Sequence, residues 1–105
     1  MDMNTFEVLA EPTRRRILDL IREDERSVGD LVARLAMSQP AVSKHLRVLR
    51  EEGFVGSRVD AQRRIYTLKP SRLMEVEGWL APYRRYWASR LDSLERHLDG
   101  QKEEA

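Results

Sequence analysis

The segment SQPAVSKHLRVLREEG, residues 38–53, most narrows the folds that this chain can adopt. It opens with Ser38, a favoured N-cap residue, and closes with Gly53, which suits the left-handed position that ends a helix. Its apolar residues recur on one side at helical spacing: Val42, Leu46 and Leu49. A second helical pattern, SVGDLVARL, ends about three residues earlier, a connection length typical of a helix-turn-helix. The two segments together therefore predict that motif.

The rest of the chain extends this motif into a winged helix-turn-helix. Two strand-like runs, FVGSRV and RRIYTL, follow it on either side of DAQ. Pro70 ends the second run, and Ser71 can cap a long final helix. We predict a mainly α (α+β) fold, formed as one domain over residues 1–105. Its parts are the recognition helix at 38–53, a two-stranded β-hairpin wing at 54–69 and a long C-terminal dimerisation helix at 71–99.

Several local expectations accompany this fold. Residues 23–26 are charged and are expected to form an exposed break between two helices. Ala61 disfavours positive φ, which leaves room for a hairpin turn wider than two residues. The N-terminal helix is expected to carry Phe6, Leu9 and Ala10 on one side. The inner face of the hairpin is expected to hold Val55, Val59, Tyr66 and Leu68.

Positive charge gathers in the middle of the chain although the net charge is only +1. Residues 38–69 hold seven Lys and Arg against three Asp and Glu, whereas both flanking thirds are slightly negative. Such clustering favours nucleic-acid binding. At 100° per residue, the side of the later helix that faces away from its apolar stripe carries Gln39, Pro40, Ser43, Lys44 and Arg47, with His45 at its border.

The segments LAEPTRRRILDLI and SQPAVSKHLRVLREEGFV, with the arginine-tipped hairpin, resemble the ArsR/SmtB family of bacterial transcriptional repressors. The resemblance covers residues 5–69, and WLAPYRRYWASRLDSLERHL resembles the final helix of a branch that lacks the metal-binding cysteines. It implies a homodimer that binds palindromic double-stranded operator DNA in the major groove and usually represses its own operon. The DNA contacts that we expect come from Ser38, Gln39, Pro40, Ser43, Lys44, His45, Arg47, Arg58, Arg63 and Arg64.

The apolar stripe of residues 71–99 is longer than one side of a small winged domain needs. Part of it must therefore be covered from outside, and the simplest cover is the same helix of a second copy. Aromatic residues in the stripe would also suit a ligand pocket, but core and dimer contacts are the commoner use. The predicted dimer interface comprises Phe6, Leu9, Leu80, Tyr83, Trp87, Leu91, Leu94 and Leu98.

The composition bears on metals, cofactors and location. The chain has no cysteine, so it has no disulfide and no thiolate metal site. His97 lies near two aspartates, but a metal site needs more than one well-placed partner. We therefore predict no metal site and no cofactor, and the small-molecule effector is unknown. The N-terminus lacks signal-peptide order and no apolar run approaches the ~20 residues of a membrane span, so we expect a cytoplasmic protein without membrane contact.

The sequence is compatible with several alternatives. A winged-helix module for protein association would explain the same pattern, although it does not need three arginines near the wing tip. An enzyme is disfavoured, because no nucleophile–base pair and no glycine-rich phosphate loop is present. His45 is a DNA contact or a structural residue bonded to the preceding turn. Among Arg14, Arg15 and Arg16, at least one is expected to pack its stem or to pair with an acid such as Asp19 or Glu23.

Overall fold

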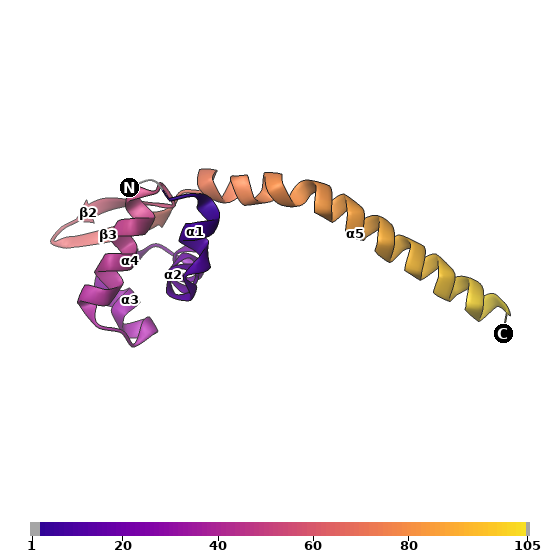
Figure 1. Ribbon diagram of the computed structural model, residues 1–105. Coiled ribbons are helices and arrows are strands. Elements are labelled where there is room, and N and C mark those ends of the chain that lie inside the picture. Colours follow the sequence, from indigo (N-terminus) through magenta and orange to yellow (C-terminus); the bar gives the residue numbers. More distant parts are fainter. Residues whose placement is uncertain (1–2, 105) are drawn as a thin grey trace. The chain divides into compact units, whose positions relative to one another are not determined.

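The computed structural model describes the backbone of residues 3–104 and the side chains of residues 3–100. The chain divides into two compact units, the first ending at Glu75 and the second beginning at Val76. The single-domain assignment over residues 1–105 stays a prediction. The elements in chain order are α1 (Thr5–Ala10), α2 (Pro12–Glu23), β1 (Arg26–Ser27), α3 (Val28–Leu35), α4 (Gln39–Glu51), β2 (Val55–Asp60), β3 (Arg63–Leu68) and α5 (Ser71–Glu104) (Figure 1). This order confirms the winged helix-turn-helix fold.

The helix-turn-helix consists of α3 and α4, joined by three residues. Ala36 ends α3 in the left-handed conformation, with φ of 53°. Ser38 caps α4, because its Oγ accepts a hydrogen bond from the Ala41 N–H at 3.3 Å. Pro40 lies in the first turn, where its missing N–H costs no helical hydrogen bond. Gly53 follows the helix with φ of 81°, as its place in the sequence predicts.

The core of the first unit lies between α2, α3, α4 and the root of the hairpin. Each large apolar side chain buried there contributes roughly 1.5–3 kcal/mol of transfer free energy. The predicted stripe of α4 is fully buried within this core. Helix α1 adds Val8 to the core, whereas Phe6 is 47% exposed. The largest fully buried side chains are Phe54, Ile17, Leu31, Leu46, Leu49, Val8, Val42 and Val55.

A third strand joins the hairpin, in the segment that the sequence predicted to be an exposed break. Strand β1 pairs antiparallel with β3, so the sheet order is β1-β3-β2. The prediction was wrong for Arg26, which is only 8% exposed. Its guanidinium is satisfied by the Leu20 carbonyl at 3.0 Å and by carboxylates of Glu23 and Asp30. Burial of an arginine is tolerated when its donors are matched in this way.

The hairpin is tighter than Ala61 suggested. Asp60 and Arg63 are paired across the two strands, so the loop has only two residues. Ala61 adopts the required positive φ, 57°, despite the steric cost of its Cβ. The expected inner face is confirmed at the root of the hairpin, but Val59 is 70% exposed because it lies beyond the core, near the tip.

Arg72, in the first turn of α5, connects three parts of the first unit. Its guanidinium donates to the Glu52 carbonyl at 2.5 Å, to the Met3 carbonyl at 3.2 Å and to the Thr5 hydroxyl at 3.1 Å. It also lies 5.1 Å from the centre of the Phe54 ring. The end of α4 is thereby fastened to the N-terminal segment and to the beginning of α5.

The second unit is the remainder of α5, which continues through Pro82 as helix. Within it, the rings of Trp79 and Tyr83 lie 5.0 Å apart between centroids. Most of its large apolar side chains are about half exposed. None of the helices in the described part of the chain combines the length and apolarity that crossing a bilayer requires.

Candidate DNA-binding surface

Helix α4 presents a polar arc opposite its buried stripe. Gln39, Pro40, Ser43, Lys44 and Arg47 are all exposed, as the helical spacing predicts. The arc is rigidly supported, because the apolar residues behind it are fully buried in the core. A helix held in this way can present amide, hydroxyl and cationic groups to the edges of base pairs.

The side chains of the arc are largely available for a ligand. Within residues 3–100, Gln39, Ser43 and Lys44 have no side-chain hydrogen bond or ion pair. Arg47 forms an ion pair with Glu51 at 3.5 Å, but both side chains are mainly exposed. Such pairs contribute roughly 0–1 kcal/mol, so a phosphate can replace the carboxylate. Ser38 uses its oxygen as the helix cap and keeps its hydroxyl hydrogen to donate.

His45 lies at the border of the arc, half-buried. Its Nδ1 is buried and has no hydrogen-bond partner in the described residues, so this atom does not form the bond to the preceding turn that was one of the two alternatives for His45. Desolvation lowers the pKa of His45, and nearby Arg14 and Lys44 act in the same direction, against the opposing effect of Glu11. This lowered pKa favours the neutral imidazole over the cation that a phosphate contact would use.

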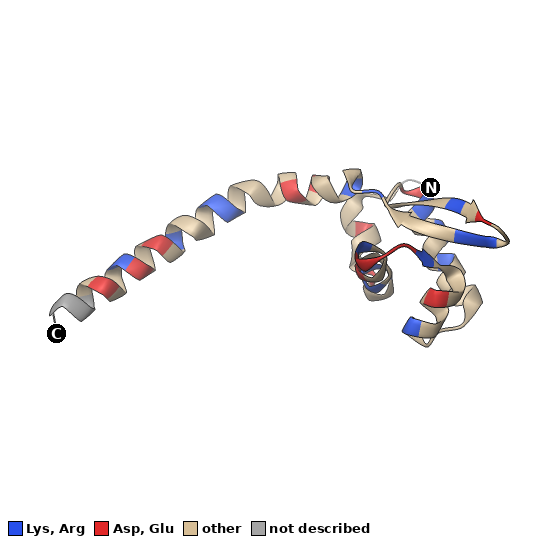
Figure 2. Ribbon diagram, turned by 180° about the vertical axis from the view of Figure 1, so that it is seen from behind, with Lys and Arg blue, Asp and Glu red and all other residues tan. Residues whose placement is uncertain are grey.

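The three predicted wing arginines do not lie on one face of the hairpin. Directly paired residues share a face of a sheet, and successive residues alternate. The pairs Asp60–Arg63 and Arg58–Ile65 therefore share one face, whereas Arg64 shares the other with Val59. Figure 2 shows the basic residues on both strands of this hairpin.

Arg58 and Arg63 are engaged by the segment around β1. Arg58 Nη2 lies 2.5 Å from Glu25 Oε2, and this hydrogen-bonded carboxylate raises the pKa of Arg58. Arg63 Nη2 donates to Ser27 Oγ at 2.9 Å. Arg64 is exposed and has no side-chain hydrogen bond or ion pair within the described residues. The wing thus offers one uncommitted arginine and two that are already bound.

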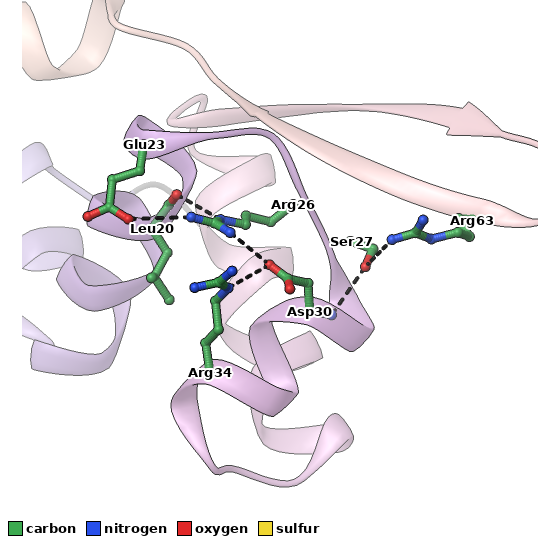
Figure 3. A network of polar contacts seen from close by, with 7 residues as sticks. All are labelled: Leu20, Glu23, Arg26, Ser27, Asp30, Arg34 and Arg63. Carbon is green, nitrogen blue, oxygen red and sulfur yellow. Dashed lines mark hydrogen bonds and ion pairs between the residues drawn. The ribbon is translucent and has the colours of Figure 1, made fainter.

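A polar network anchors this contact region (Figure 3). Ser27 caps α3 by accepting from the Asp30 N–H at 3.1 Å. The Asp30 carboxylate accepts from Arg26 at 3.1 Å and from Arg34 at 3.0 Å. Desolvation raises the pKa of Asp30, but these hydrogen bonds and charges outweigh it, so the net shift is downward. The network fixes β1 against the ends of α2 and α3.

The arginine run at the start of α2 has a structural role, with partners that the sequence did not identify. Arg14 Nε donates to the Val8 carbonyl at 2.8 Å, and Arg15 Nη1 donates to the Leu9 carbonyl at 2.5 Å. These carbonyls belong to the end of α1, where helical donors are missing. The suggested acid partners, Asp19 and Glu23, are not the ones used. Arg16 is exposed.

Arg50 was absent from the predicted contacts although it lies on the same arc of α4. It is exposed, and at 100° per residue it falls between Gln39 and Ser43. It lies about 10 Å along the helix from Ser43, at a rise of 1.5 Å per residue. The spacing that located the other residues would have found it.

The predicted dimer residues lie in both units. Leu9 and Leu80 are half-buried, and the remaining side chains of this set, Phe6, Tyr83, Trp87, Leu91, Leu94 and Leu98, are exposed. The interface stays a prediction. Among the residues that the structure describes, no three His, Cys, Asp or Glu side chains gather into a group that could hold a metal ion.

Comparison with known proteins places this arrangement in a family. Residues 11–57 match the family model described as bacterial regulatory protein, arsR family. The transcriptional repressor SdpR of Bacillus subtilis is 30% identical over 77 residues, which cover 73% of this chain and 86% of SdpR. The HTH-type transcriptional regulator Rv2034 of Mycobacterium tuberculosis is 33% identical over 96 residues, which cover 91% of this chain and 87% of that protein.

A solved structure agrees with these relatives. The crystal structure of the ArsR family transcriptional regulator RHA00566 superposes with a TM-score of 0.69 at 26% identity, and the match covers 85% of this chain and 98% of that one. The family model, the relatives and the fold all point to regulation of transcription, and none to catalysis. The chain therefore belongs to the ArsR family and is a transcriptional regulator, not an enzyme.

Proposed function

We propose that the protein is a homodimeric repressor that places α4 in the major groove of a palindromic operator, most simply the one in its own promoter. The observation that carries this proposal is the polar arc of α4, whose side chains are largely available for a ligand and which is supported by a fully buried apolar stripe. Gln39 suits the N6 and N7 edge of adenine, and Arg47 suits guanine or a phosphate. Lys44 is a point charge that suits phosphate. Pro40 offers an apolar surface to a thymine methyl group.

The dimer is part of the proposal because one recognition helix reads only a half-site. Two copies joined by α5 would hold their α4 helices about one turn of DNA apart, ~34 Å, as a palindrome requires. The exposed apolar residues of α5 support such a seam, since isolated helices rarely leave a long apolar stripe in water. A repressor of this kind would act in the cytoplasm, where its DNA lies. Without cysteine it has no thiolate metal sensor.

The test is binding of the purified protein to a labelled fragment of its own promoter, followed by fluorescence anisotropy. We expect preference for one site over random DNA by about 10³-fold or more. Lys44→Ala should weaken binding to both DNAs. The matched control is Arg22→Ala, which removes an exposed cation of α2 outside the proposed surface. Equal affinity for promoter and random DNA would contradict an operator and favour a protein-association module.

A further inference from the structure

The outer half of the wing has little backbone support. Strand β1 pairs with β3 only at Tyr66 and Ile65, so residues 59–64 are supported in the sheet by each other alone. An isolated two-stranded hairpin is marginally stable in water. Side-chain contacts that reach this half of the wing from outside can therefore decide its orientation.

Residues 3–100 provide two such contacts, and both lie on the same face. Arg58 binds the Glu25 carboxylate at 2.5 Å, and Arg63 donates to Ser27 Oγ at 2.9 Å. Their partners come from the α2–α3 connection, more than 30 residues away in sequence. Ser27 is itself rigidly held, because it is buried, caps α3 and pairs with Ile65 through its backbone. These two contacts are called the wing brace below.

We propose that Glu25 and Ser27 are positioning residues for DNA binding, and that Arg64 is the wing residue that contacts DNA. The brace holds Arg58 and Arg63 on one face, and so orients the opposite face, which carries Arg64 and Val59. On this view, two of the three wing arginines act within the protein rather than on phosphate. The inference rests on the proposed DNA-binding function. It adds Glu25 and Ser27, which lie outside the recognition helix and the wing, to the residues on which DNA binding depends.

The sign of one mutation separates this proposal from plain electrostatics. Glu25 is a negative charge close to a basic wing. If it acts only through its charge, its removal strengthens binding to all DNA. If it orients the wing, its removal weakens binding to the operator, because the wing then samples other orientations. The two effects have opposite signs, so Glu25→Gln distinguishes them.

The experiment compares operator and random DNA for the full-length protein. We expect Glu25→Gln to lower operator affinity three- to ten-fold and to leave random-DNA affinity unchanged or slightly raised. Arg58→Gln should give the same loss, and the double variant should lose no more than either single variant. The matched control is Asp24→Asn, an exposed neighbour that removes the same charge without touching the brace, and it should not lower operator affinity.

Arg64 gives the second arm. Arg64→Gln should weaken binding to both DNAs and reduce the slope of log K against log salt by about 1 for each protomer. Glu25 and Arg58 side chains are about half exposed, so their variants are expected to fold, and urea midpoints will verify this. An increase or no change in operator affinity for Glu25→Gln would overturn the proposal, as would an Arg64→Gln protein with normal affinity. If the unmodified protein shows no operator preference, the proposed function itself is wrong.

Discussion

Replacement of Arg72 by methionine should remove a large part of the stability of the first unit. Methionine keeps an unbranched apolar stem, so the change isolates the guanidinium. Four donor–acceptor contacts are lost, to the carbonyls of Glu52 and Met3, to the hydroxyl of Thr5 and to the Glu75 carboxylate. The Glu52 carboxylate, 3.7 Å from Arg72 and only 11% exposed as a side chain, also loses its cation.

The magnitude follows from these contacts. Removal of one partner of a fully buried ion pair costs roughly 3–5 kcal/mol. The Arg72 side chain is 23% exposed, and the Glu52 carboxylate keeps a weak bond from the Met3 N–H at 3.4 Å, so the cost should be lower. We expect a loss of about 2–4 kcal/mol, against a total stability of roughly 5–15 kcal/mol for a typical domain.

Urea denaturation followed by circular dichroism measures this loss. Arg72→Lys should lose about half as much, since it keeps the charge but not the several directed donors. Arg85→Met, on an exposed part of the same helix, should change stability by less than about 0.5 kcal/mol. In Arg72→Met, the further change Glu52→Gln should restore about 1 kcal/mol. A stability within 0.5 kcal/mol of the parent for Arg72→Met would refute the reasoning.

Gln39→Ala should weaken operator binding by about 1–3 kcal/mol and leave the affinity for random DNA unchanged. Equal losses of affinity for both DNAs, measured by anisotropy, would mean that Gln39 contacts the DNA backbone and not a base. Ala36→Gly, at φ of 53°, should raise the free energy of unfolding by about 0.5–1 kcal/mol in urea, and a decrease would contradict strain there. Burial lowers the folded-state pKa of His45 below 6.5, so the neutral side chain contributes fully to stability above pH 6.5, and this contribution is lost on acidification. Thermal melts at several pH values should show the loss as a fall in Tm, and His45→Gln should make Tm less dependent on pH. The double variant Leu91→Glu, Leu94→Glu should be a monomer in analytical ultracentrifugation, and a persistent dimer would mean that the dimer interface lies elsewhere.

The sequence predicts α4 closely because every signal for it is local. The cap at Ser38, the proline in the first turn and the left-handed Gly53 each act within one helical turn. The buried stripe repeats at a period that a helix alone produces. The exposed arc of the candidate site follows from the same period. These features do not depend on any distant part of the chain.

The features that the sequence misses depend on distant partners. Arg26 looks like part of an exposed loop, and only its pairing with β3 and the acceptors around it make burial favourable. Arg14 and Arg15 have acids within helical reach, yet they donate to α1. The break between α1 and α2 leaves those carbonyls without helical donors, and Pro12 has no N–H to offer. At Ala61, the register of the two strands imposes a positive φ that alanine by itself disfavours.

The division among the wing arginines affects the salt dependence of DNA binding. A count of the wing's charges from the sequence alone would overestimate how steep this dependence is. If Lys44, Arg47 and Arg64 meet phosphate in each protomer, a dimer neutralises about six phosphates, and log K should fall with log salt at a slope near −5. If Arg58 and Arg63 also bind phosphate, the number rises to about ten and the slope to about −9. The brace contacts therefore predict the shallower slope. A measured slope near −9 would mean that DNA draws both arginines away from Glu25 and Ser27.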